Sequence, residues 1–331
     1  MNLLWLQSGG CGGCTLSWLG SELGPLFATL RDENIDILWH PSLSEASNHE
    51  AQELLRACAN GLQPVDIICI EGALLRGPNG TGRFHTMAGT GIPMIDWVCQ
   101  IASRARHVVA VGTCAAYGGV TAAGPNPTDA CGLQYEGSLS GGLLGAEFRD
   151  ATGLPVINIA GCPTHPDWVT ETLIALARGR LQDADLDPLG RPRFYTDHLV
   201  HHGCARNEYY EFKASADRPT GQGCLMEHLG CKGTQAHADC NLRPWNGGGS
   251  CLTGGSPCIR CTEPGFEEPG HPFAQTPKVA GIPIGLPSDM PKAWFVALAA
   301  LSKSATPERV KVNAQADHVV SPPTVREGRK G

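Results

Sequence analysis

The stretch LLWLQSGGCGGCTLSWL, residues Leu3–Leu19, places two cysteines in a glycine run between an apolar strand-like segment and an apolar helix-like segment. Glycine-rich turns from a strand to a helix commonly bind phosphate through backbone N–H groups. Here Cys11 and Cys14 occupy the centre of the turn instead. The stretch therefore raises the question of what a strand-to-helix turn with two thiols binds.

Short apolar runs recur through the first half of the chain and alternate with helical patterns. The runs are Leu3–Leu6, Ile35–Trp39, Val65–Ile70, His107–Val111 and Val156–Ile159, and the helical patterns are Ser44–Ala59, Met94–Ala105 and Asp167–Arg178. Strands that alternate with helices predict an α/β fold with a parallel, doubly wound sheet covered on both faces. The continuously apolar strands fit burial on both faces.

Length and composition exclude several classes of protein. The 331 residues are enough for two domains, and 42% hydrophobic with 17% charged residues describes a globular chain. A net charge of −7 without a basic block argues against binding nucleic acid. The longest apolar run, Ala293–Leu301, falls short of the roughly 20 residues of a membrane span, and no export signal is recognisable. We therefore expect a cytoplasmic protein without a membrane span.

Regular patterns become scarce after about Arg180. Pro188–Arg193 resembles a linker, and helical periodicity is sparse from Gly221 to Pro287. A long irregular stretch in a compact domain indicates an organiser other than a hydrophobic core. Because twelve cysteines and histidines lie between His198 and Cys261, metal is the natural candidate. The polar tail Pro307–Gly331 lacks periodicity and is expected to order only against a partner.

Fifteen cysteines in a chain expected to be cytoplasmic indicate metal or redox chemistry rather than disulfides. Four of them, Cys11, Cys14, Cys114 and Cys162, follow predicted parallel strands, whose carboxyl ends meet at one edge of the sheet. Four thiolates at one edge favour a cubane iron–sulfur cluster. Taken alone, the CxxC pair could also be a redox pair or half of a zinc site.

Two more sets of ligands follow in the irregular region. They are His201, Cys204, Cys224 and Cys231, and then Cys240, Cys251, Cys258 and Cys261. Together with the first set they supply twelve ligands, enough for three four-iron clusters, although zinc could also organise such a region. His201 stands out because it lies about one helical turn from Cys204.

The remaining cysteines and histidines are weaker candidates. Three cysteines, Cys58, Cys69 and Cys99, lie in apolar or helical patterns and are most simply core residues, whereas Cys131 has no assigned role. The histidines that compete with His201 are its neighbours His198, His202, His228 and His237.

Seven blocks, in order, give the chain a family resemblance. It resembles the small, electron-transferring subunit of nickel–iron hydrogenases over nearly its whole length. The blocks are LQSGGCGGC, IEGALLRGPNGTG, AVGTCAAYGG, NIAGCPTHP, HHGCARNEYYEF, CLMEHLGCKG and PCIRCTEPGF. The resemblance implies a flavodoxin-like domain at 1–180, an iron–sulfur domain of loops and short helices at 190–290, and a C-terminal extension at 291–331. The nickel–iron site would belong to a separate large subunit.

The resemblance also assigns the three ligand sets. Cys11, Cys14, Cys114 and Cys162 would hold the proximal cluster, His201, Cys204, Cys224 and Cys231 the distal cluster, and Cys240, Cys251, Cys258 and Cys261 the medial cluster. Many relatives have proline in place of Cys251 and then hold a three-iron medial cluster, so a thiolate there implies a four-iron cluster. Gly10 replaces a glutamate that the family often has, and six residues rather than five separate Cys224 from Cys231.

The absence of an export signal and an anchor favours the soluble, hydrogen-sensing type of this family. Such a sensor signals to a histidine kinase, a contact that the C-terminal extension would help to form, and we expect a dimer of heterodimers. The alternatives are a cytosolic uptake hydrogenase that feeds an acceptor and, from another class, a zinc-stabilised binding module. In each hydrogenase interpretation the chain relays electrons through its clusters and needs no general acid or base of its own.

Overall fold

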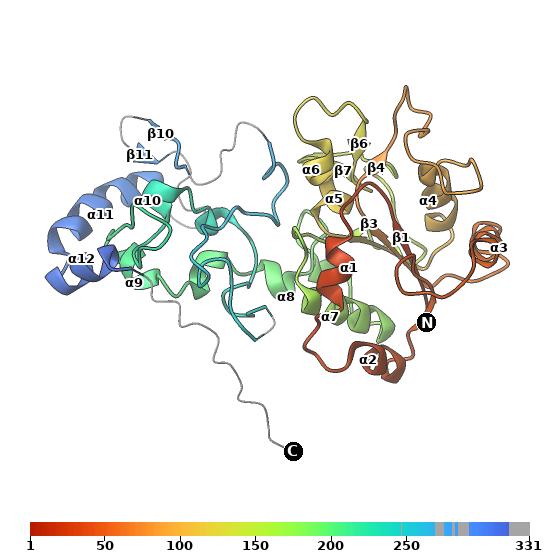
Figure 1. Ribbon diagram of the computed structural model, residues 1–331, viewed down its shortest axis with the longest axis horizontal. Coiled ribbons are helices and arrows are strands. Elements are labelled where there is room, and N and C mark those ends of the chain that lie inside the picture. Colours follow the sequence, from red (N-terminus) through yellow and green to blue (C-terminus); the bar gives the residue numbers. More distant parts are fainter. Residues whose placement is uncertain (246, 269–274, 280–281, 284–290, 318–331) are drawn as a thin grey trace, which may run out of the picture.

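The computed structural model describes residues 1–245, 247–268, 275–279, 282–283 and 291–317. Its first part is built on a five-stranded parallel sheet with the strand order β2-β1-β3-β5-β9 (Figure 1). The strands are β1 (Asn2–Gln7), β2 (Asp36–Trp39), β3 (Ile67–Glu71), β5 (His107–Val111) and β9 (Ile157–Ile159). All five apolar runs form strands, and the predicted α/β fold is confirmed.

Helices cover both faces of the sheet. Successive side chains of a strand point to opposite faces, so a continuously apolar strand makes both faces apolar and both need cover. Leu3 and Trp5 of β1 belong to one hydrophobic core, whereas Leu4 and Leu6 belong to the other. The first core includes residues of α1 (Gly13–Trp18), α2 (Leu26–Asp32) and α7 (Pro166–Ala177), and the second includes residues of α3 (Asn48–Ala59), α4 (Met94–Ala102) and α5 (Thr113–Tyr117). Burial on both faces explains the continuously apolar strands.

The three predicted helices form with slightly different ends. α3 begins at Asn48 rather than Ser44, because Ser47 caps it. The Ser47 hydroxyl accepts a hydrogen bond from the Glu50 N–H, and the Glu50 carboxylate accepts one from the Ser47 N–H. Short elements beside the sheet, with no counterpart in the prediction, are α6 (Gly119–Ala122) and the strand pairs β4–β6 (Leu74–Leu75, Ala130–Cys131) and β7–β8 (Tyr135–Glu136, Leu139–Ser140).

The second half consists mainly of loops joined by short elements (Figure 1). These are the 3-10 turns η1 (Asp183–Asp185), η2 (Val200–Gly203) and η3 (Gly233–Gln235), the helices α8 (Arg193–Thr196), α9 (Asn207–Glu211) and α10 (Met226–Leu229), and the strand pair β10–β11 (Lys278–Val279, Ile282–Pro283). The sparse periodicity of this region therefore reflects a loop-rich structure.

The expectation of an irregular tail is wrong for its described part. α11 (Lys292–Ala305) is followed by α12 (Glu308–Gln315), which begins after Pro307. Val310 and Ala314 are one helical turn apart and are buried in a small core with Ala214. Two apolar residues were too few to give a recognisable period, yet they suffice to dock this helix. The expectation for residues 318–331 lies outside the described residues.

The linker expectation for Pro188–Arg193 is also wrong. Arg191 in this segment is only 3% exposed, and its guanidinium donates hydrogen bonds to acidic and main-chain groups, as described below. Among the four cysteines outside the ligand sets, Cys58 and Cys69 are core residues as predicted, but Cys99 is only half-buried. Cys131 is buried in β6, so it too is a core residue.

Candidate functional site: three groups of thiols

The glycine–cysteine turn follows the carboxyl end of β1. That strand ends at Gln7, and α1 begins at Gly13 after Gly12, whose φ of 74° is a left-handed conformation that glycine adopts without strain. Cys11 is exposed at this turn, whereas Cys14 is half-buried. The turn therefore presents two thiols at the edge of the sheet where ligand sites of doubly wound folds form.

Two further loops bring Cys114 and Cys162 to the same edge. Cys114 lies on α5, which directly follows β5, and Cys162 follows β9. The Cys14 thiol interacts electrostatically with those of Cys114 and Cys162, and Cys11 interacts with Cys114. These four cysteines thus form one group, which is termed the proximal site.

Glycines keep the space around these thiols open. A Cβ at Gly112 would lie 2.5 Å from the Cys14 Sγ, and one at Gly119 would lie 2.8 Å from the Cys114 Sγ. Both glycines also have positive φ angles, 86° and 54°. A cradle that one methyl group would obstruct fits a bulky group bound by the thiols, such as an iron–sulfur cluster.

We expect the substitution Gly112→Ala to abolish cluster binding at the proximal site, because the methyl group would occupy the space beside Cys14 and strain the backbone. Electron paramagnetic resonance (EPR) of the reduced protein should lose the proximal signal and keep the others. Gly80→Ala is the matched control, since Gly80 has a similar φ of 73° but open space around it. A full proximal signal in Gly112→Ala would show that the cradle is not needed.

The medial site consists of Cys240, Cys251, Cys258 and Cys261. All four line one cavity of about 340 Å³, whose wall also contains apolar side chains such as Leu252. The Cys261 thiol interacts electrostatically with Cys251, and so does the Cys240 thiol. Cys251 therefore lies near two of the other three thiols and lines the same cavity as all of them, and this roomy, sulfur-lined cavity fits a cluster.

The distal site consists of His201, Cys204, Cys224 and Cys231. These four side chains line a second, narrower cavity of about 20 Å³. Their donor set fits an iron–sulfur cluster chemically, and the side chains would have to spread apart to admit one. Of the competing histidines, His202 accepts a hydrogen bond from the Leu199 N–H, and His237 contacts Glu263.

Burial raises the pKa of most of these thiols. It raises the pKa of Cys162 and of Cys224 to about 12, and that of Cys261 to about 11. Such thiols keep their protons at neutral pH unless a metal displaces them. Their environment therefore suits metal binding better than a role as free nucleophiles.

Close contacts connect the three sites in the order proximal, medial, distal. The Cys162 thiol of the proximal site interacts electrostatically with the Cys261 thiol of the medial site. The Cys258 N–H of the medial site donates to the Cys231 Sγ of the distal site at 3.4 Å. In addition, Cys162 lines the medial cavity. The sites are therefore direct neighbours along one path.

Glu71 is a buried functional residue that the sequence did not single out. It ends β3 and is 3% exposed. Its Oε1 accepts hydrogen bonds from the N–H groups of Cys14 (3.0 Å) and Thr15 (3.1 Å), and its Oε2 accepts from the side chains of Trp5, Gln7 and Thr15. The carboxylate thus holds the cysteine turn against the sheet. The clues in the sequence were an acidic residue that ends an entirely apolar strand and its place in the block IEGALLRGPNGTG.

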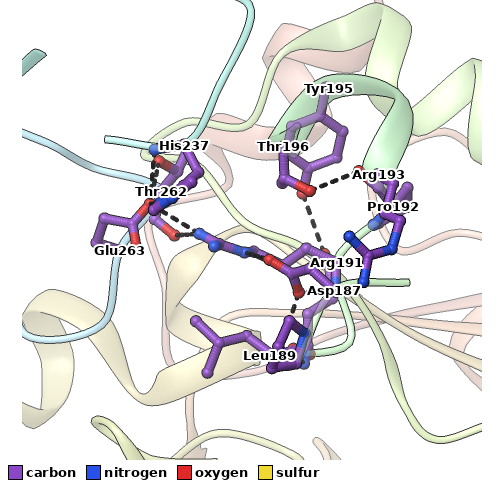
Figure 2. A network of polar contacts seen from close by, with 12 residues as sticks. Asp187, Leu189, Arg191, Pro192, Arg193, Tyr195, Thr196, His237, Thr262 and Glu263 are labelled. Carbon is purple, nitrogen blue, oxygen red and sulfur yellow. Dashed lines mark hydrogen bonds and ion pairs between the residues drawn. The ribbon is translucent and has the colours of Figure 1, made fainter. Parts of the chain in front are cut away.

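A second missed feature is a buried ionic network beside the medial site (Figure 2). Arg191 donates to Asp187 (2.8 Å), to Glu263 (2.9 Å) and to the carbonyl oxygen of Thr262 (2.9 Å). Glu263 also accepts a hydrogen bond from the His237 N–H at 2.8 Å. Burial opposes the charge of Glu263, but the His237 hydrogen bonds and the Arg191 charge lower the pKa of this carboxyl group to about 2. The network fixes the loops that carry Cys240 and Cys261.

Comparisons with known proteins match both halves of the chain. Residues 11–176 match the family model described as NADH ubiquinone oxidoreductase, 20 Kd subunit, and residues 196–274 match the model for the C-terminal part of the NiFe/NiFeSe hydrogenase small subunit. The chain is 34% identical over 298 residues to the F420 non-reducing hydrogenase II small subunit of Methanosarcina mazei, covering 82% of this chain and 74% of that protein. It is 29% identical to the periplasmic NiFeSe hydrogenase small subunit of Desulfomicrobium baculatum, with 82% and 86% covered.

Solved structures agree with these matches. An actinobacterial-type NiFe-hydrogenase from Ralstonia eutropha H16 superposes with a TM-score of 0.74 at 27% identity, covering 99% of this chain and 95% of that chain. The recombinant NiFeSe hydrogenase from Desulfovibrio vulgaris Hildenborough gives 0.69 at 32% identity, covering 83% and 97%. In the part of the chain that the structure describes, no helix has the length and apolarity of a membrane span.

Proposed function

This chain belongs to the family of small subunits of NiFe hydrogenases, and from that membership we propose that it relays electrons between the nickel–iron site of its large-subunit partner and an acceptor. Membership makes the chain a component of an oxidoreductase complex. The observation that supports the relay best is the direct adjacency of the three thiol groups: Cys162 and Cys261 line the same cavity, and the Cys258 N–H donates a hydrogen bond to the Cys231 Sγ.

The proposed ligands are the twelve side chains of the proximal, medial and distal sites. Iron–sulfur clusters, when bound, supply one-electron carriers. The cysteine thiolates would set the negative charge of each site, and the neutral imidazole of His201 would leave the distal site less negative than an all-cysteine site. For the domains we propose the boundaries given above, 1–180, 190–290 and 291–331.

Iron and sulfide analysis and visible absorption of the purified two-subunit protein test this relay. We expect a brown protein whose broad visible absorption bleaches when hydrogen is added, because thiolate-bound clusters absorb across the visible range. A colourless protein loaded with zinc would favour the zinc-stabilised binding module and would contradict the relay. A Cys11→Ser variant that kept an intact proximal signal would contradict the proximal ligand assignment alone.

We further propose that this small subunit serves a cytosolic hydrogen sensor that signals to a histidine kinase. The resemblance of WLQSGGCGGCTLS and of the C-terminal extension to the sensor type supports this subtype. The extension also offers a contact surface, since Trp294, Leu298 and Leu301 lie on one side of α11 and are 67%, 44% and 64% exposed. A dimer of heterodimers is part of the same proposal.

Kinase binding and growth on hydrogen distinguish the sensor from the uptake enzyme. A sensor should bind the kinase, turn over slowly with a soluble dye, and be dispensable for growth when hydrogenase expression is made constitutive. High dye-reducing turnover together with loss of growth on hydrogen after deletion would favour the uptake enzyme instead.

Cys251 provides a test of the medial assignment. We expect Cys251→Pro to convert the medial cluster to a three-iron form, because one of the four thiols that line the cavity is lost. The measurement is EPR of the oxidised protein, in which a three-iron cluster gives a signal that an oxidised four-iron cluster lacks. Cys99→Ser, at a half-buried cysteine on α4, is the matched control. An unchanged cluster type in Cys251→Pro would show that Cys251 is not a ligand.

A further inference from the structure

Two basic side chains lie beside the distal site, and we propose that they are fixed counter-charges that make this site the preferred location of an electron in the chain. They are Arg206 and Lys213, neither of which belongs to the proposed ligand sets. The inference rests on the proposed relay, and it predicts where reducing equivalents accumulate.

Arg206 is a buried cation, 5% exposed, that is held by main-chain oxygens. Its Nη1 donates to the carbonyl oxygens of Gly221 (2.6 Å) and Gly223 (2.8 Å), and its Nε donates to that of Leu252 (3.2 Å). Among the residues that the structure describes, no carboxylate forms an ion pair with it. A buried charge normally has a partner of opposite sign.

The available partner of Arg206 is the distal thiol group. Its guanidinium interacts electrostatically with all three distal cysteines, Cys204, Cys224 and Cys231. Its own N–H also donates to the Cys204 Sγ at 3.3 Å. Both the charge and the backbone of Arg206 therefore favour negative charge at the distal site, and an added electron increases that negative charge.

Lys213 supplies a second positive charge close to the same site. Its Nζ donates to the Tyr210 carbonyl oxygen at 2.9 Å and lies 3.8 Å from the centroid of the Tyr210 ring. That ring is 4.1 Å from the ring of His201, and the charge of Lys213 interacts with Cys224. The carbonyl oxygen and the ring of Tyr210 therefore position the ammonium beside the distal site.

Nearby carboxylates do not cancel these charges. Glu227 also interacts with Lys213, but it is paired with Lys303 at 2.7 Å, and Glu211 is exposed to solvent. Water screens an exposed carboxylate far more than a buried one. The net fixed charge beside the distal site is therefore positive.

The other two sites have different surroundings. The proximal thiols interact with the carboxylates of Glu71 and Glu267. Near the medial thiols, Asp239 is paired with Arg243 at 2.9 Å, Glu263 is paired with Arg191 at 2.9 Å, and Lys232 adds a positive charge that interacts with Cys258. The charged side chains are thus acidic at the proximal site, paired apart from the charge of Lys232 at the medial site, and include two cations, Arg206 and Lys213, at the distal site. This ordering favours electrons at the distal end.

Redox titration of the purified two-subunit protein, followed by EPR and visible absorption, tests the proposal. In the wild type we expect the distal site to be reduced first. In Lys213→Met we expect the equilibrium constant for reduction of the distal site to fall about tenfold, which lowers its potential by about 59 mV for one electron. In Lys213→Arg we expect the potential to stay near that of the wild type. Arg206→Gln should shift the same potential in the same direction and further, because Arg206 interacts with three thiols.

Lys311→Met is the matched control, since it removes an exposed lysine of α12 and should leave all three potentials unchanged. If Arg206→Gln does not fold, Lys213→Met and Lys213→Arg still decide the question. An unshifted distal potential in Lys213→Met, or equal shifts at all three sites, would overturn the proposal. Absence of iron and sulfide in the wild type would instead defeat the proposed relay itself.

Discussion

Replacing Arg191 by methionine is expected to lower the free energy of unfolding by about 3–5 kcal/mol and to remove the medial cluster. The methionine would leave Asp187 and Glu263 without their shared cation, although Glu263 is almost completely buried. The Thr262 carbonyl oxygen would also lose its donor. Since Cys261 directly precedes Thr262 and Glu263, the loss of the Arg191 contacts should displace a proposed medial ligand.

The measurements are guanidinium unfolding of the two-subunit protein and EPR of its reduced clusters. Arg178→Met is the matched control: the Arg178 guanidinium also donates two hydrogen bonds to carboxylate oxygens, both of Glu33, but at the surface, so we expect little change there. The double variant Arg191→Met/Glu263→Gln should recover part of the stability, because it no longer buries an unpaired Glu263 charge. Normal stability with an intact medial signal in Arg191→Met would contradict a positioning role.

The sheet could be predicted because all of its strands except the partly exposed edge strand β2 are buried on both faces and therefore leave continuous apolar runs in the sequence. The grouping of the thiols followed from the same sheet, since Cys11, Cys114 and Cys162 each come soon after a parallel strand, and such loops meet at one edge. For the medial and distal sites the sheet gave no guidance. Their grouping came from spacing and from the family resemblance.

The supporting residues could not be predicted because they act through distant partners. Glu71 is 57 residues from Cys14, and Arg191 is 72 residues from Glu263. Neither pairing leaves a periodic pattern, and the proline and glycine around Arg191 resemble a flexible linker. A short charged segment can be either a linker or a buried anchor, and only the tertiary contacts distinguish the two. α12 was also missed, because Val310 and Ala314 are its buried residues and two such positions give no recognisable period; they pack against the distant Ala214.

Glu71→Ala should both destabilise the fold and abolish the proximal site. It removes the acceptor of two backbone N–H groups, those of Cys14 and Thr15, and of the buried indole N–H of Trp5. Each buried donor left without a partner costs about 1–3 kcal/mol. We therefore expect about 3 kcal/mol or more of lost stability and no proximal cluster, measured by guanidinium unfolding and by EPR.

Glu71→Gln separates the charge of this residue from its hydrogen bonds. The amide oxygen can still accept hydrogen bonds from the N–H groups of Cys14 and Thr15, but the amide NH₂ is itself a donor and cannot accept from Trp5 and Gln7. Because only part of the hydrogen bonds is lost, the stability should fall by less than in Glu71→Ala. Where the cluster persists, removing the carboxylate charge beside Cys14 should raise its potential, because reduction then adds negative charge to a less negative site. Glu50→Gln, at the exposed cap of α3, should leave that potential unchanged. A proximal potential that is the same in Glu71→Gln as in the wild type would mean that Glu71 only supports the turn, and that the acidic end of the charge ordering lies elsewhere.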